Sequence, residues 1–162
     1  MPFGTDGSRG DLDGRGDIHD LVVHFYREIV FDEVLAPVFT ELAEVDWTVH
    51  IPRLIDYWCR VLLRQPGYAG AVLGAHREVH DLGAFRLQHF DRWYSLWVRS
   101  IEGSWAGPLA EQAKRHAARV ATALARQLLD TTWSPPAPVP VGISPEGNAA
   151  SPGPAAPRRL VT

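Results

Sequence analysis

The chain has 162 residues, of which 46% are hydrophobic and 22% charged, with a formal net charge of −3 at pH 7. These values are typical of a globular domain, and the weak negative charge argues against a broad basic surface for nucleic acid or anionic membranes. Cys59 is the only cysteine, which excludes an internal disulfide and suggests a packed thiol. Because no apolar run is long enough for a membrane span or a secretory signal, we expect a cytoplasmic protein without membrane or nucleic-acid partners.

Composition divides the chain into three segments. Residues 1–16 are mostly Gly, Asp and Arg, which predicts a disordered N-terminal arm. Residues 131–162 are rich in Pro and Ala, with eight of the 13 prolines after Trp133, which predicts a disordered tail. Between them, residues 17–130 show helical periodicity and no convincing strand pattern. This segment is expected to form one all-α domain with a single core.

The first helix is expected to begin near Asp17, a good N-cap residue. Its apolar side chains fall on one face of a helix. They are Ile18, Leu21, Val22, Phe25 and Ile29. Tyr26 lies at the margin of this stripe. It is either a core-edge tyrosine or a hydrogen-bond donor pointing into a pocket.

Pro37 breaks the following segment into short helical turns that end at Phe39. A second long helix follows, and Asp46 is a candidate cap. If Asp46 is the cap, Pro52 lies inside the helix, where it removes a hydrogen bond. The helix could instead begin nearer Pro52, which would leave His50 in a loop. A helix-end or core role and a ligand-binding role both remain open for His50.

A turn at 65–70 leads to a short helix at 71–81 that carries His76 and His80 one turn apart. Two histidines at this spacing can share a metal ion, but no third Asp, Glu or Cys ligand accompanies them, so a zinc site is weakly supported. His89 is expected at the start of the next helix. These histidines precede a run of large aromatic residues.

The last two helices are expected at 87–102 and 108–129, with Gly103 ending the first and Pro108 starting the second. The first carries an aromatic stripe. Its members are Phe90, Trp93, Tyr94 and Trp97. The second presents a face with several small residues, which permits close approach to a neighbouring helix. That buried face is expected to comprise Leu109, Ala113, Ala117, Val120, Leu124 and Leu128.

Several motifs occur in a fixed order along the chain. They are Phe25-Tyr26, Pro37-Val38-Phe39, a helix that begins Asp46-Trp47-Thr48-Val49-His50 and continues to Tyr57-Trp58, then His80, and the run from His89 to Trp93. Taken together, this set resembles the truncated (two-over-two) haemoglobins, and within them group III. The resemblance extends from about residue 18 to 129, nearly all of the expected domain. Tyr57 departs from the group III pattern, which usually has phenylalanine there.

The resemblance implies a globin-like, truncated two-over-two helical sandwich around haem. By the family's spacing from the helix tryptophan, His80 is the expected iron ligand, with His76 as the alternative. Tyr26, His50 and Trp93 match the positions that face the bound ligand. The expected haem-lining residues are Phe39, Leu54, His80, Phe90 and Trp93.

The function implied by the resemblance is binding of O2, and of CO or NO, at a five-coordinate iron with a polar distal pocket. One alternative is a haem enzyme for nitric oxide detoxification or peroxidase-like chemistry, which would need an external reductase. A second alternative is a cofactor-free helical interaction module, in which the aromatic residues serve only as core.

Overall fold

The computed structural model describes residues 9–39, 46–66, 76, 80–81 and 85–137. Four long helices make up its regular structure, and the described ranges contain no strand, so the all-α prediction is confirmed. The helices are α1 (Arg15–Val30), α2 (Trp47–Leu63), α4 (Leu87–Glu102) and α5 (Pro108–Leu129). None of these helices is both long and apolar enough to cross a membrane. Most of the short helix expected at 71–81 lies outside the described residues.

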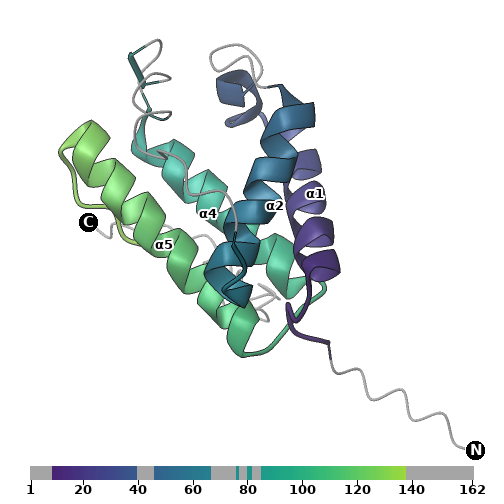
Figure 1. The fold of residues 1–162 in the computed structure, drawn as a ribbon. Coiled ribbons are helices and arrows are strands. Elements are labelled where there is room, and N and C mark those ends of the chain that lie inside the picture. The colour runs from purple at the N-terminus through teal and green to yellow at the C-terminus, as the bar shows by residue number, and fades with distance from the viewer. Residues whose placement is uncertain (1–8, 40–45, 67–75, 77–79, 82–84, 138–162) are drawn as a thin grey trace, which may run out of the picture.

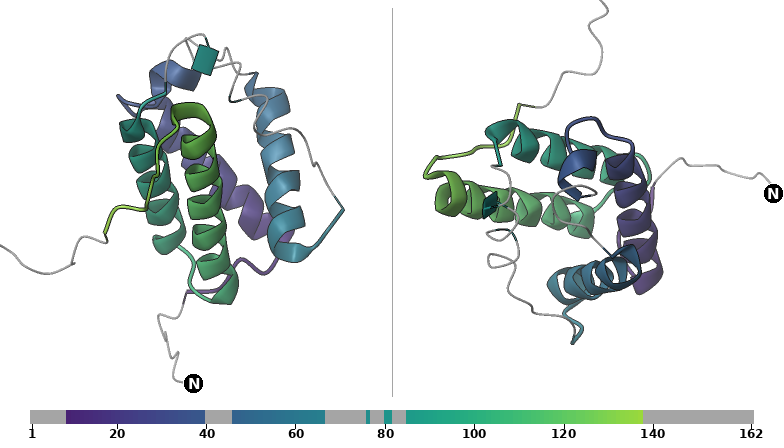
Figure 2. Two further views of the ribbon diagram at one scale, coloured as in Figure 1. Left: turned by 90° about the vertical axis from the view of Figure 1, so that its left-hand side faces the viewer. Right: turned by 90° about the horizontal axis from the view of Figure 1, so that it is seen from above.

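The helices pack as two pairs, α1 with α2 and α4 with α5 (Figure 1). The pairs meet mainly where α1 contacts α4, and α2 contacts α5 over a smaller area. The end of α1, the beginning of α2, the beginning of α4 and the end of α5 lie at one end of the molecule (Figures 1 and 2). Residues 80–81 lie at the same end. Most of the motifs noted in the sequence are therefore gathered at this end, whereas Tyr57-Trp58 lies further along α2.

The core confirms the apolar stripe predicted for α1, whose five members are at most 1% exposed. The buried face of α5 consists mainly of alanines and differs in part from the predicted face. Its members are Ala110, Ala113, Ala117, Ala121, Leu124 and Ala125. Leu109, Val120 and Leu128 are only half-buried. The small side chains let α5 lie close to α4, where Trp97 and Ile101 are buried.

The first helix begins earlier than predicted, at Arg15 rather than near Asp17. Gly14 is the N-cap residue. The Asp17 carboxylate lies within the first turn and accepts a hydrogen bond from the Gly14 N–H at 3.1 Å. Asp17 therefore does stabilise the helix start, but from inside the first turn.

The prediction of disorder for residues 1–16 is wrong for the residues nearest the domain. Leu12 is fully buried in the core. The Asp11 carboxylate accepts hydrogen bonds from the N–H groups of Leu109 and Ala110, at 2.8 and 2.7 Å, and so caps the start of α5. The low average hydrophobicity of residues 1–16 did not reveal that Leu12 belongs to the core or that Asp11 caps a helix. Residues 1–8 lie outside the described part.

The second long helix begins at Trp47 with Asp46 as its cap, the first of the two predicted possibilities. The Asp46 carboxylate accepts a hydrogen bond from the Thr48 N–H at 3.0 Å. Pro52 is therefore inside the helix, where its missing N–H leaves the Thr48 carbonyl without its helical donor. His50 consequently lies in the first turns of α2 and not in a loop.

The predicted disordered tail also begins too early. Trp133 is only 4% exposed, and its indole N–H donates to the Asp91 carboxylate at 2.8 Å. Its ring packs edge-on against Tyr94, with centroids 5.6 Å apart. Trp133 is thus part of a second core cluster, which α4 and α5 share with the segment after α5. Residues 138–162 lie outside the described part.

Candidate functional site

An aromatic cluster joins α1, the turn that follows it and α2. Tyr26 is at its centre, 8% exposed, with its ring centroid 5.9 Å from Phe39, 5.5 Å from Trp47 and 5.4 Å from His50. The cap at Asp46 fixes where α2 begins, and that start places Trp47 and His50 beside Tyr26. The structure therefore brings together three residues that the sequence marked as site candidates, namely Tyr26, Phe39 and His50.

His50 contributes a buried nitrogen with no hydrogen-bond partner, its Nε2. An unpaired buried polar atom costs roughly 1–3 kcal/mol, so such an atom calls for a functional explanation. Burial, reinforced by the electrostatic influence of His76 and Arg53, lowers the pKa of His50. At neutral pH the ring is therefore uncharged and can donate or accept one hydrogen bond through this nitrogen.

The hydroxyl of Tyr26 is held as a neutral phenol. Burial raises the pKa of Tyr26 well above its ordinary value. None of the described residues accepts a hydrogen bond from this hydroxyl. Tyr26 can therefore donate to a molecule bound in the site.

His76 and His80 both lie beside Phe85, a residue that the sequence did not mark. The His80 ring is stacked on Phe85 at a centroid distance of 5.8 Å and an interplanar angle of 9°. Its Nδ1 accepts a hydrogen bond from the Phe85 N–H at 3.0 Å, which leaves Nε2 for any metal. Binding a metal through Nε2 requires that nitrogen to be unprotonated, so the tautomer or the Phe85 contact must change on binding.

His76 remains an alternative ligand. Its ring is tilted against Phe85 with centroids 6.3 Å apart. It is also near enough to His50 to influence the pKa of that residue. His76 and His80 thus share one aromatic neighbour, and only His76 is linked electrostatically to the cluster around Tyr26.

Trp93 connects the two core clusters and is half-buried. Its ring lies 6.1 Å from Phe25 and 6.5 Å from Trp97. The indole N–H groups of Trp97, Trp105 and Trp133 donate to protein oxygens. The N–H of Trp93 has no such acceptor among the described residues, so it can serve a bound ligand.

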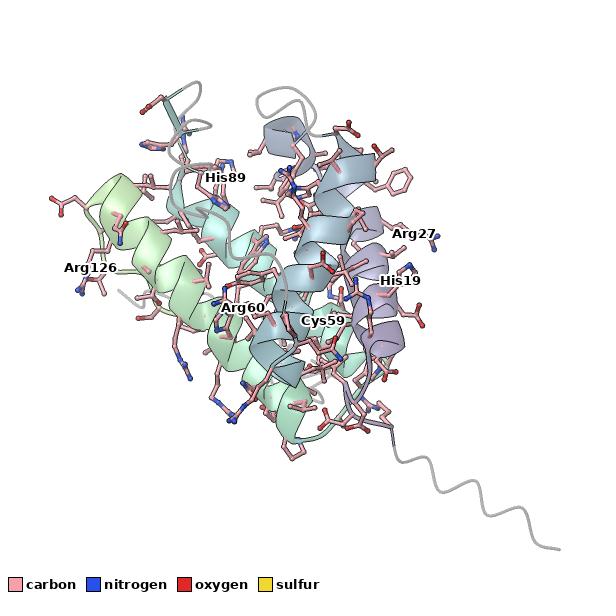
Figure 3. The ribbon with its side chains drawn as sticks, in the orientation of Figure 1. His19, Arg27, Cys59, Arg60, His89 and Arg126 are labelled. Atoms are coloured by element: carbon pink, nitrogen blue, oxygen red, sulfur yellow. The ribbon has the colours of Figure 1, made fainter. Side chains whose placement is uncertain are left out.

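The remaining expected haem-lining residues occupy different surroundings. Leu54 is half-buried against the main core, one turn beyond His50. Phe90 is 8% exposed and belongs to the second cluster, 6.2 Å from Phe85. His89 is placed at the start of α4 (Figure 3), where its Nδ1 accepts a hydrogen bond from the Arg86 N–H at 2.8 Å. The predicted helix-start position of His89 is confirmed.

An ion pair between the buried Asp32 and the exposed Arg92 holds α4 against the turn that carries Phe39. The Asp32 carboxylate is bonded to Arg92 and accepts hydrogen bonds from the N–H groups of Val34 and Leu35. Burial favours a higher pKa for Asp32, but these hydrogen bonds outweigh it and keep the pKa below its ordinary value. Helical periodicity does not indicate this pair, because the partners are 60 residues apart in the chain.

A shallow apolar groove of about 220 Å³ approaches the Tyr26 cluster from the outer side of α1 and α2. Its lining consists of Val23, Tyr26, Arg27, Val30, Trp47 and Ile51. Trp47 was also missed as a site residue. The sequence feature that could have marked Trp47 is its position directly after the helix cap Asp46, one turn before His50.

Comparison with known proteins finds similarity both in sequence and in fold. The chain is 28% identical over 87 residues to the group 3 truncated haemoglobin ctb of Campylobacter jejuni. That alignment covers 52% of this chain and 66% of the relative, just under two thirds of the relative's length. No protein-family model matches the chain.

The fold itself matches more completely. The crystal structure of a group III truncated haemoglobin from Campylobacter jejuni superposes with a TM-score of 0.63 at 24% identity. The superposition covers 79% of this chain and 95% of that structure. The chain therefore has the all-α truncated globin fold, and the resemblance to group III truncated haemoglobins expected from its sequence is confirmed.

Proposed function

We propose that this chain is a haem-binding globin that binds O2, and also CO or NO, with His80 as the protein ligand to iron. The unpartnered Nε2 of His50 is the observation that carries the proposal. It lies beside the buried Tyr26 in a cluster of aromatic rings. A buried polar atom without a partner, next to a phenol that can donate, fits a site for a small polar ligand.

The residues around this position suit haem. Aromatic rings form apolar walls for a planar cofactor, and histidines lie beside Phe85 at the same end of the helices. Haem, if bound through His80, would supply an iron able to bind a diatomic ligand. No cluster of three or more His, Cys, Asp or Glu side chains that could hold a bare metal ion occurs in the described ranges.

The side chains facing the ligand have separate roles in this proposal. Tyr26 and Trp93 donate hydrogen bonds to the ligand, and each bond is worth roughly 1.5–3 kcal/mol if the ligand carries negative charge. His50 accepts or donates through Nε2. Phe39 and Leu54 exclude water, which strengthens these interactions.

Haem titration of the full-length protein tests the proposal. Added haemin should give a Soret band, and reduction followed by CO should shift it. His80→Ala should weaken haem binding and alter both spectra, whereas His24→Ala, at an exposed position on α1, should leave them unchanged. A folded protein that takes up no haem would refute the proposal.

His76→Ala separates the two candidate ligands. If His80 binds iron, His76→Ala retains the five-coordinate ferrous spectrum. Loss of that spectrum in His76→Ala, with His80→Ala unaffected, would assign the iron to His76 instead. Both variants should keep the helical circular dichroism of the wild type, since both rings lie outside the two main core clusters.

A haem enzyme is the second candidate function, and a row of stacked tryptophans that begins at Trp93 favours it. Nitric oxide detoxification or peroxidase-like turnover would use the same site and an external reductase. Rates of NO consumption and of peroxide-dependent oxidation, measured in wild type and Tyr26→Phe, distinguish turnover from simple binding.

A further inference from the structure

Four aromatic residues form a continuous row from the candidate site to the interface of α2 with α5. We call this row the aromatic relay; its members are Trp93, Trp97, Trp58 and Tyr57. Trp93 and Trp97 are parallel, with centroids 6.5 Å apart. Trp97 stacks on Trp58 at 4.5 Å, and Trp58 meets Tyr57 edge-on at 5.5 Å.

The interior of the relay is dry. Trp97 is 1% and Trp58 4% exposed. The Trp97 indole is held by a hydrogen bond to the Ala113 carbonyl at 3.2 Å. Rings in near contact and shielded from water permit rapid electron transfer, because tunnelling weakens steeply with distance and solvent reorganisation is small.

The relay ends at a paired phenol and imidazole. The Tyr57 hydroxyl lies 2.6 Å from Nε2 of His116, and both residues are half-buried. Burial, then the charge of Arg119, lowers the pKa of His116, so the ring is neutral and can accept a proton. Burial raises the pKa of Tyr57, which therefore keeps its proton until it is oxidised.

We propose that the aromatic relay carries single oxidising equivalents from the candidate site to the Tyr57–His116 pair, where a small anionic reductant removes them. Arg60 and Arg119 act electrostatically on Tyr57 and His116, respectively, and both are exposed. Arg60 lies on α2 (Figure 3), three residues after Tyr57 in the chain. Two guanidinium groups favour an anionic donor such as ascorbate over a cationic one.

The transfer is balanced in electrons and protons. Trp58, once oxidised through the relay, takes one electron from the Tyr57 phenol and returns to its closed-shell form. The phenolic O–H bond breaks, and its proton passes to Nε2 of His116. The products are a neutral tyrosyl radical and an imidazolium ion. One electron from ascorbate and the proton from His116 then restore the phenol.

The source of the oxidising equivalents rests on the proposed function. With haem bound, a hydroperoxide would be the oxidant: it would take up two electrons and two protons to give an alcohol and water, and Trp93 would be the first ring to supply one of these electrons. The relay itself is a property of the chain, so it can be examined without haem.

Two other described tyrosines lack the features of Tyr57. Tyr26 lies 5.5 Å from Trp47, but no described residue accepts a hydrogen bond from its hydroxyl. Tyr94 packs against Trp133 and has no bonded histidine. Tyr57 is thus the described tyrosine with a base in place, and Tyr94 provides a matched control.

Pulse radiolysis of the full-length protein with the azide radical tests the relay. This radical oxidises tryptophan directly, so the experiment does not depend on haem. In the wild type, the tryptophan radical should decay at a rate independent of protein concentration while a tyrosyl radical appears. Tyr57→Phe, which removes only the hydroxyl, should lose most of the tyrosyl signal, and Tyr94→Phe should retain it.

His116→Gln tests the proton acceptor separately. Glutamine can accept the Tyr57 hydrogen bond but cannot take the proton, so tyrosyl formation should slow roughly a hundredfold, the lower end of what a positioned base contributes. A wild-type rate in His116→Gln would overturn the role of His116. An unchanged tyrosyl signal in Tyr57→Phe, or an equal loss in Tyr94→Phe, would overturn the relay.

A second measurement separates this inference from the proposed function. Haem-loaded protein is mixed with hydrogen peroxide and freeze-quenched, and the radical is identified by electron paramagnetic resonance in wild type and Tyr57→Phe. A tyrosyl signal lost in Tyr57→Phe and quenched by ascorbate supports the proposal. If the azide radical initiates electron transfer to Tyr57 but the protein takes up no haem, only the proposed source of the oxidant is refuted. Haem uptake without a Tyr57 radical would refute the relay.

Discussion

The hydroxyl of Tyr26 is a donor without a described acceptor, in a site from which water is largely excluded. If it bonds to O2 in the haem form, Tyr26→Phe should speed O2 dissociation by about 10- to 100-fold, which corresponds to a bond of roughly 1.5–3 kcal/mol. The change should be seen by stopped-flow replacement of O2 with CO. Binding of CO itself should change much less, because bound CO carries little negative charge.

Tyr94→Phe is the control for this measurement, because Tyr94 packs against Trp133 and away from the Tyr26 cluster. Its O2 dissociation rate should equal that of the wild type. Tyr26→Phe should also be no less stable than the wild type, because it removes a hydroxyl that has no hydrogen-bond partner among the described residues. Equal dissociation rates in Tyr26→Phe and wild type would remove Tyr26 from the ligand site.

At the residue scale, the sequence marked candidate site residues but not their contacts. Tyr26 and His50 were marked by order and spacing along two helices, which are local properties. The stacking of His80 on Phe85 and the unpartnered Nε2 of His50 are features of tertiary packing. Such contacts join residues that helical periodicity does not relate, so the sequence left His76 and His80 as alternatives.

At the scale of elements, the start of α5 depends on a residue that precedes α1. The Asp11 carboxylate supplies the cap that α5 lacks locally, since Gly107 has no side chain. Gly107 has a φ of +140°, and a Cβ there would lie 2.5 Å from Asp11. The capping carboxylate and the glycine are therefore matched, and together they fasten the N-terminal segment to the domain.

Asp11→Ala should lower the free energy of unfolding by about 1–2 kcal/mol, the usual contribution of an N-cap with favourable helix-dipole interaction. Urea denaturation followed by circular dichroism measures this difference. Asp13→Ala is the control, because Asp13 is exposed and belongs to the same segment. Equal destabilisation by the two changes would show that only the overall charge of the segment matters.

At the scale of the whole molecule, the periodicity of each helix predicted its buried stripe, and the four helices were placed within a few residues of their observed bounds. The pairing of helices was implied by the family resemblance and not by the stripes. Trp133 and Leu12 show why the domain limits were misjudged. Each is a single buried apolar residue in a polar or proline-rich segment. The average composition of such a segment does not reveal one buried residue.

Three partly or largely buried histidines make the stability of the whole fold sensitive to mild acid. Burial is the main cause that lowers the pKa of His50, His89 and His116 from an ordinary value of 6.5. The folded chain therefore binds protons less tightly than the unfolded chain at these sites. Their contribution to stability is fully present above about pH 6.5 and decreases as pH falls from there through the lower folded pKa values.

Urea denaturation at several pH values between about 7 and 5 should thus show a falling free energy of unfolding, and a variant with all three histidines changed to Gln should show a shallower fall. Asp32 does not interfere, because its pKa is lowered from 3.8 and its stabilising effect is lost only in stronger acid. An equally steep fall in the triple variant would show that other groups govern the response. A steeper one would mean that the histidines stabilise the fold when protonated, contrary to the burial of His50 Nε2 without a partner.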